Sequence, residues 1–276
     1  MSSILYPPAR PQSIGEVLDS AFRIFKVSLL PCLPYGVLAT VAGQLQNIYL
    51  IVTGRSLRTF ANADPYWWVL YLLGAILGGT LLNAIFVRQA AIAVGSRISA
   101  SAALREALRK TPATIGLGVL IVAVLAICFI PLFAVPRIYW PTARLALGAV
   151  AACIAVFFLC SWPALLVGRK SVIESLRYSA RLIRGHWWRT VLIYAVAVTM
   201  IIVVSVTAAI IFSILAAVGA TRDLAVTTAI SAVMVVASGA VYMPFVTAMT
   251  LSLYADLQAR REGIDLERRI AGAPAS

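Results

Sequence analysis

Residues 190–217 read TVLIYAVAVTMIIVVSVTAAIIFSILAA, a run without a charged side chain. A helix needs about 20 apolar residues to cross the hydrocarbon core of a bilayer, and this run exceeds that length. The run is continuously apolar and does not alternate with period two, which argues against a strand of an outer-membrane barrel. Because lipid offers no hydrogen bonds, the backbone groups must be satisfied within the segment, and we expect a membrane-spanning helix.

Five further apolar runs of comparable length are separated by short basic stretches. The chain of 276 residues is 62% hydrophobic and only 12% charged, whereas a soluble domain is about one-quarter charged. The sequence therefore predicts an all-α polytopic membrane helix bundle that forms a single domain over 1–276. The expected spans are Val27–Val52, Trp67–Val87, Ile115–Val135, Leu145–Val167, Thr190–Ala217 and a sixth that begins near Leu224 and carries Pro244.

The cations are divided unequally between the two faces of this bundle. With six spans, both chain ends lie on one side, and all but five of the 23 Lys and Arg residues fall on that side. The positive-inside rule places it in the cytoplasm. The start of the chain, MSSILYPPARPQ, lacks the apolar core of a signal peptide, so we expect no cleaved leader. The five cations of the other face are Arg55, Arg58, Arg137, Arg144 and Arg222.

The segment SVIESLRYSARLIRGHWWR, residues 171–189, predicts an amphipathic helix in the cytoplasmic interface before the fifth span. Ser171 and Glu174 have the spacing of a capping box, and Gly185 is expected to end the helix. One face of this helix is mostly apolar, and the opposite face is charged. The first face holds Val172, Ile173, Leu176, Ser179, Ala180 and Ile183, and the second holds Glu174, Arg177, Arg181 and Arg184.

The same pattern occurs at the N-terminus and, more weakly, in the middle of the chain. A shift of 158 residues places Ser13 on Ser171 and Glu16 on Glu174, and the middle copy is SAALREALRKTP, residues 101–112. Each copy directly precedes a pair of spans. We therefore predict a threefold repeat of interfacial helix, span and span, over approximately 13–90, 99–168 and 171–256, followed by a cytoplasmic tail over 257–276.

Basic and aromatic residues at the expected membrane boundaries indicate contact with lipid headgroups. A juxtamembrane cation gains about 1 kcal/mol near anionic lipid, and Trp is enriched at both interfaces. We expect membrane lipids, above all anionic ones, as partners, and no nucleic acid, because the cations follow the topology; the C-terminal tail is a candidate docking site for a membrane protein. The expected headgroup cations are Arg23, Lys26, Arg105, Arg109, Lys110, Arg177, Arg181, Arg184 and Arg189, and the expected anchors are Trp67, Trp68, Trp140, Trp187 and Trp188.

Three segments resemble the glycerophosphoryl diester phosphodiesterase membrane-domain family. They are WPALLVGRKSVIESLRYSARLIRGHWWR (162–189), LSLYADLQARREGIDLERRI (251–270) and SIGEVLDSAFRIFK (13–26). In that family the membrane region occurs alone or fused to a metal-dependent phosphodiesterase barrel, and it has no agreed activity of its own. The resemblance implies the architecture above and a bacterial inner membrane as the location, and nothing in this chain matches the phosphodiesterase barrel.

The side chains that carry most enzyme chemistry are scarce. His186 is the chain's single histidine, so a metal site with two histidines or an acid–base histidine pair cannot form within one chain. The ten acids fall in loops, interfacial segments or the tail, with Asp256 at the very end of the last span. The four cysteines lie in apolar segments without C-x-x-C spacing and indicate packing. We expect no enzymatic activity, no cofactor and no metal.

A few polar side chains fall within the spans. Gln44, Asn47 and Asn83 are expected either to join helices or to face a small polar crevice. Gly74 and Gly78 form a G-x-x-x-G motif, which permits close helix packing within the bundle or in a dimer. The favoured hypothesis is a non-catalytic membrane protein that organises lipid or a partner protein at the cytoplasmic leaflet. The alternative is a transporter, channel or permease subunit for a small or lipid-like solute, which requires a hollow centre.

Overall fold

The computed structural model describes residues 11–54, 64–96, 98–134, 136, 139–218 and 224–271. These residues form helices and connecting turns, without a β-strand. Six helical segments are long and apolar enough to cross a membrane, in agreement with the six predicted spans. The chain is a multi-pass membrane protein of the all-α class.

The helices follow one another along the chain with short connections. The first half contains α1 (Ile14–Gly43), α2 (Leu45–Thr53), α3 (Pro65–Ala93), α4 (Ala100–Ile127) and the short 3-10 helix η2 (Ile130–Ala134). The second half contains α5 (Trp140–Val156), α6 (Ser161–Leu166), α7 (Val172–Ile183), α8 (Trp187–Val218) and α9 (Leu224–Ala271).

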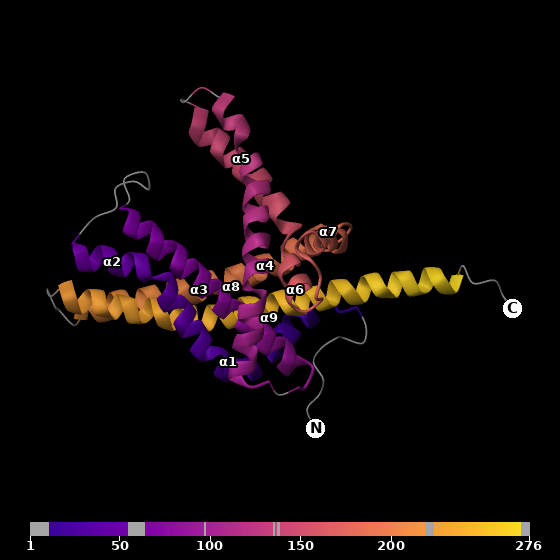
Figure 1. Ribbon diagram of the computed structural model, residues 1–276, viewed down its shortest axis with the longest axis horizontal. Coiled ribbons are helices and arrows are strands. Elements are labelled where there is room, and N and C mark those ends of the chain that lie inside the picture. The colour runs from indigo at the N-terminus through magenta and orange to yellow at the C-terminus, as the bar shows by residue number, and fades with distance from the viewer. Residues whose placement is uncertain are drawn as a thin grey trace.

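Three of the spans form the packed body of the molecule. In the apolar windows of α1, α3 and α9, 39%, 33% and 33% of the residues are buried within the protein, against only 6% in the span that begins with α4 and 12% in α8. In Figure 1, α1 and α3 lie against the middle of the long helix α9. The other spans expose most of their apolar side chains, as expected for helices that face lipid.

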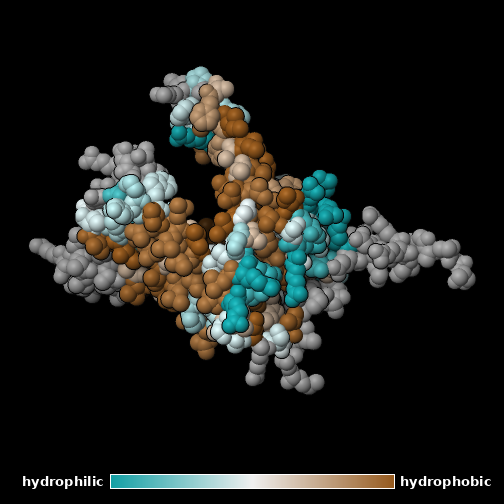
Figure 2. Space-filling model, in the orientation of Figure 1, coloured by the Kyte–Doolittle hydropathy of each residue, from teal (hydrophilic) through white to brown (hydrophobic). Residues whose placement is uncertain are grey.

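The hairpin of α4 and α5 stands apart from this body as a limb. Figure 1 shows both helices rising from the body to a common tip, and Figure 2 shows that the limb is covered mainly by hydrophobic side chains. Phe133 is 85% exposed and Leu145 76% exposed. Such surface is unfavourable in water, so the limb requires an apolar environment, as a membrane-spanning hairpin would have.

The expected interfacial helices are only partly separate from the spans. The N-terminal segment runs without a break into α1, and the middle segment runs into α4, so that only α7 is a helix of its own. The first expected span is interrupted at Gln44, whose backbone N–H bonds to Val41 O at 3.0 Å and ends α1 before α2 begins. The sequence pattern predicts helical turns in these segments but does not show where a helix continues through them.

Small residues allow the helices of the body to approach closely. A Cβ atom added at Gly74 would collide with the carbonyl oxygen of Ala42 on α1, and one added at Gly78 would lie 3.5 Å from Ala39 O. The G-x-x-x-G motif therefore packs α3 against α1 within one chain. On the other side of α1, a Cβ at Gly36 would lie 2.6 Å from Ala240 O on α9.

Replacing Gly74 with Ala should destabilise the protein, because the backbone of α1 would have to move away from α3. We expect a loss of about 1–3 kcal/mol, measured as a lower melting temperature in detergent. Gly79 on the same helix provides the control, since nothing lies within 4 Å of an added Cβ. Gly79→Ala should be neutral or slightly stabilising, and equal melting temperatures for the two variants would contradict the close contact.

Candidate functional site: the basic end of the bundle

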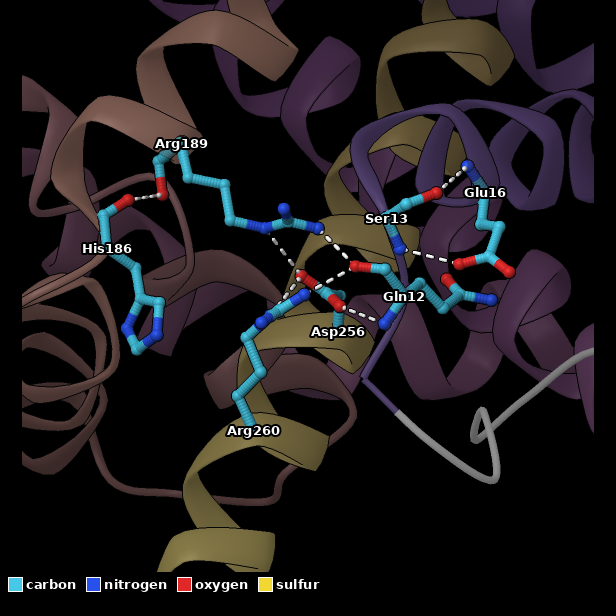
Figure 3. Close-up of polar contacts among 8 residues, drawn as sticks. Gln12, Ser13, Glu16, His186, Arg189, Asp256 and Arg260 are labelled. Atoms are coloured by element: carbon cyan, nitrogen blue, oxygen red, sulfur yellow. Dashed lines mark hydrogen bonds and ion pairs between the residues drawn. The ribbon is translucent and has the colours of Figure 1, made fainter.

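A fully buried carboxylate organises one end of the body (Figure 3). Asp256 of α9 is 0% exposed, and its Oδ2 lies 3.1 Å from Nε of Arg189 and 3.1 Å from Nε of Arg260. Its Oδ1 accepts a hydrogen bond of 2.8 Å from the backbone N–H of Gln12. Both guanidinium groups also donate to the Gln12 carbonyl oxygen. We call the end of the bundle that holds these four residues the basic end.

Each member of this network is positioned by its local sequence. Asp256 and Arg260 are four residues apart on α9 and therefore share a helix face. Arg189 lies in the first turn of α8. Gln12 directly precedes Ser13, the N-cap of α1, which forms a full capping box with Glu16. The network thus joins the starts of α1 and α8 to one point on α9.

The arrangement offsets the cost of burying a charge. An isolated carboxylate without water would be strongly destabilising, and two guanidinium groups plus one N–H replace its hydration. Arg189 and Arg260 are themselves 19% and 24% exposed, so they remain in partial contact with solvent. The chemistry of the network is that of a structural clamp, because its polar atoms are occupied by one another.

The variant Asp256→Asn should therefore loosen the basic end. It keeps the shape of the side chain but leaves two cations without their counter-charge, and we expect a loss of about 3 kcal/mol. A lower melting temperature in detergent would measure it. Glu174→Gln removes an exposed ion pair to Lys170, 3.2 Å long, and should change the melting temperature very little. If both variants melt alike, Asp256 does not clamp the helices.

His186 lies beside the network, in the turn between α7 and α8 (Figure 3). Its pKa is lowered from the ordinary value of 6.5, first because the ring is partly buried and then because Arg260, Arg189 and Arg261 disfavour a further positive charge; Asp256 acts in the opposite direction. Near neutral pH the imidazole is therefore uncharged. The lowered pKa thus follows from burial of the ring first and from the surrounding cations second.

This depressed pKa predicts a pH dependence of stability. Below pH 6.5 the unfolded chain takes up a proton on His186 more readily than the folded protein does, so stability falls as the pH decreases through this region. His186→Gln should remove this contribution. Following the melting temperature of the wild type and of His186→Gln from neutral pH to about pH 5 tests this prediction. If both melting temperatures fall equally, His186 does not contribute to the pH dependence of stability.

The expected headgroup cations divide into two groups. Six of them are exposed and form no ion pair with a described residue: Arg23, Lys26, Arg105, Arg177, Arg181 and Arg184. The other three have partners within the protein. Arg109 bonds to Glu106 at 3.0 Å, Lys110 lies 3.6 Å from the same carboxylate and donates to Leu166 O at 2.7 Å, and Arg189 belongs to the buried network.

The α7 helix presents its cations outward because its opposite side packs on the protein. Ser175, Ser179, Leu182 and Ile183 are buried, so the buried face is shifted from the apolar face read in the sequence. Ser171 caps the helix by accepting from the Glu174 N–H at 3.4 Å. The Glu174 carboxylate pairs with Lys170, however, and the reciprocal half of the expected capping box is not formed.

The expected tryptophan anchors have unequal environments. Trp188 is 74% exposed and Trp68 is 42% exposed, whereas Trp67 is only 4% exposed and stacks on Tyr71 with ring centroids 5.4 Å apart. Trp187 donates to the carbonyl oxygen of residue 153 on α5 at 3.2 Å. Trp140 lies under the Arg144 guanidinium at 5.1 Å. Trp67 and Trp187 thus contribute to helix packing.

The three residues expected at a polar crevice are not brought together. Gln44 and Asn47 bond to each other at 2.7 Å and line a mainly apolar groove of about 210 Å³ against α9. Asn83 is fully buried elsewhere, where it donates to Thr114 Oγ1 at 2.9 Å and accepts from Trp162 Nε1 at 3.1 Å. Its hydrogen bonds join α3 to α4 and α6.

A second buried amide, which sequence reasoning missed, joins the three central helices. Gln89 of α3 donates to Ser28 Oγ of α1 at 3.1 Å and to Pro244 O of α9 at 2.8 Å, and accepts from Thr247 Oγ1 at 2.7 Å. Gln89 lies just beyond the expected end of the second span, at Val87, so the sequence alone does not mark it as an intramembrane polar residue. In the structure α3 continues to Ala93.

Metal-binding groups do not converge in the part of the chain that the structure describes: it holds no set of three His, Cys, Asp or Glu side chains placed to bind an ion.

The chain was also compared with known proteins. No family model, no curated protein and no solved structure matches it.

Proposed function

We propose that this chain is a non-catalytic integral membrane protein that organises anionic lipid, or a partner protein, at the cytoplasmic leaflet of a bacterial inner membrane. The proposal rests on the division of the cations into those paired with a carboxylate of the protein and those without such a pair. Arg189 and Arg260 are used to neutralise Asp256, while six other cations project from the protein without an ion-pair partner among the described residues. Anionic headgroups would supply that partner.

The location of the free cations supports a role at one leaflet. Arg23 and Lys26 lie on α1, Arg105 lies in the first turns of α4, and the remaining three are those of α7 and its C-cap. Figure 2 shows hydrophilic side chains grouped around α7 and near the foot of the limb, while the limb between its foot and its tip is mainly hydrophobic. On this proposal the basic end is cytoplasmic, as the distribution of cations along the sequence favours.

The packing of the centre supports this role over the transporter alternative. A solute pathway needs polar groups that face a cavity, whereas the amides of Asn83 and Gln89 bond to other protein groups at the helix interfaces. The apolar core around Tyr254, Met249 and Ile183 is closely packed at the basic end. Membership of the glycerophosphoryl diester phosphodiesterase membrane-domain family, and docking of a protein on the C-terminal tail, remain parts of the proposal.

Neutralising the cations of α7 tests the proposal. The triple variant Arg177→Gln, Arg181→Gln, Arg184→Gln should fold normally, because these side chains are exposed, and should lose co-purifying anionic lipid. Quantifying phosphatidylglycerol against phosphatidylcholine after detergent extraction measures the change. Each cation contributes about 1 kcal/mol, so the enrichment should fall by more than about tenfold.

A matched control removes the same charge from the opposite face. Arg55→Gln, Arg58→Gln, Arg144→Gln should retain the anionic lipid, because the charge distribution along the sequence predicts that these residues lie on the outer face. Equal enrichment in wild type and the α7 variant would overturn the proposal, and equal loss in both triple variants would reduce it to an effect of net charge.

A further inference from the structure

A pocket of about 480 Å³ lies where the foot of the limb meets the body. It is bounded by the last turns of α3, the first turns of α4 and the turn between α6 and α7. One part of its wall is apolar and includes Val87, Ala90 and Leu166, and the other part is charged and consists of Glu106, Arg109 and Arg169. The pocket therefore offers surfaces for both halves of an amphiphile.

The charged wall carries an excess of positive charge. The Glu106 carboxylate lies 3.0 Å from the Arg109 guanidinium and 3.6 Å from the Lys110 ammonium. The side chain of Arg169 makes no hydrogen bond or ion pair with a described residue. Arg109 and Arg169 of the wall, with Lys110 beside it, outnumber the one carboxylate, so among the described residues two positive charges around the pocket have no counter-charge.

The backbone of Arg169 is held in a conformation that normally requires glycine. Its φ angle is 50°, and it is the one non-glycine residue with a positive φ in the described part of the chain. Gly54, Gly95 and Gly185 occupy the comparable positions in other turns. A strained, charged residue at the edge of a cavity indicates a functional constraint, because a glycine would satisfy the turn at lower cost.

Gly168, the neighbouring glycine, is not among the residues with a positive φ. A Cβ at Gly168 would lie 2.6 Å from Ala164 O and 2.9 Å from the Tyr254 hydroxyl, so the position serves close packing. The Lys170 N–H bonds to Ala164 O at 3.3 Å and closes the turn around both residues. Lys110 fixes the same segment by donating to Leu166 O at 2.7 Å. The Arg169 side chain is therefore presented from a well-anchored turn.

We propose that this pocket binds the phosphate group of one anionic phospholipid. Arg169 and Arg109 donate to the phosphate oxygens, and the start of an acyl chain lies against Val87 and Ala90. Arginine suits this role because its planar group donates two parallel hydrogen bonds to a phosphate. The inference deepens the proposed function, since it assigns one specific lipid site distinct from the exposed cations of α7.

The variant Arg169→Gly separates this role from a structural one. It relieves the left-handed backbone conformation, so the melting temperature should stay the same or rise. The affinity for phosphatidylglycerol, titrated into the delipidated full-length protein in detergent and read by native mass spectrometry, should fall about tenfold or more, as expected for a lost charge-assisted hydrogen bond. Arg109→Gln should also weaken binding, and Arg144→Gln on α5, which belongs to neither proposed lipid site, is the matched control that should retain it.

Several outcomes would overturn the inference. Undiminished binding by both Arg169→Gly and Arg109→Gln would show that the lipid does not occupy the pocket. Tight binding of phosphatidylcholine would show that anionic charge is not recognised. Competition by inorganic phosphate at the same concentration as the lipid would identify a free anion as the ligand.

If the α7 triple variant loses general lipid enrichment but keeps the single tight lipid, the pocket and the proposed function are separately supported. If it keeps both, the proposed function fails while the pocket stands.

Discussion

The contact on which the basic end depends is the enclosure of the Asp256 carboxylate by two guanidinium groups. A buried charge without partners would be costly, so the position of Asp256 requires that Arg189, Arg260 and Gln12 all reach it. These residues come from the start of α8, from α9 itself and from the residue before the cap of α1. One electrostatic requirement therefore joins segments that lie 67 and 244 residues apart in the chain.

Buried uncharged polar groups also need partners, and this requirement explains how the limb is attached to the body. The apolar surface of α4 has little protein to pack against, and in lipid that surface provides no preference for one neighbour over another. Polar groups at the foot supply the preference. Thr80 and Thr111 bond at 3.0 Å, Asn83 bonds to Thr114 and Trp162, and all lie on helices that meet there. The foot is thus joined by hydrogen bonds, while the tip is exposed.

The sequence predicts the part of the structure that the solvent dictates. The need for long apolar runs identifies the six spans, and helix chemistry identifies local features such as the Ser171 cap and the end of α7 before Gly185. Tertiary partners are not predictable in this way. The spacing of Asp256 and Arg260 is visible in the sequence, but nothing local points to Arg189. For the same reason Trp67 is expected at the interface and is found buried against Tyr71.

These observations change how a large positive charge should be interpreted in a membrane protein. The net charge of +13 describes the whole chain, yet its cations differ in what surrounds them. Arg189 and Arg260 are committed to a carboxylate, Lys110 is committed to Glu106 and a carbonyl group, and Arg181 is exposed. Topology rules treat all of them as equivalent because they count charges and not partners. Cations that outnumber the carboxylates around them are the ones that attract an external anion, and a function at the membrane surface has to be argued from them.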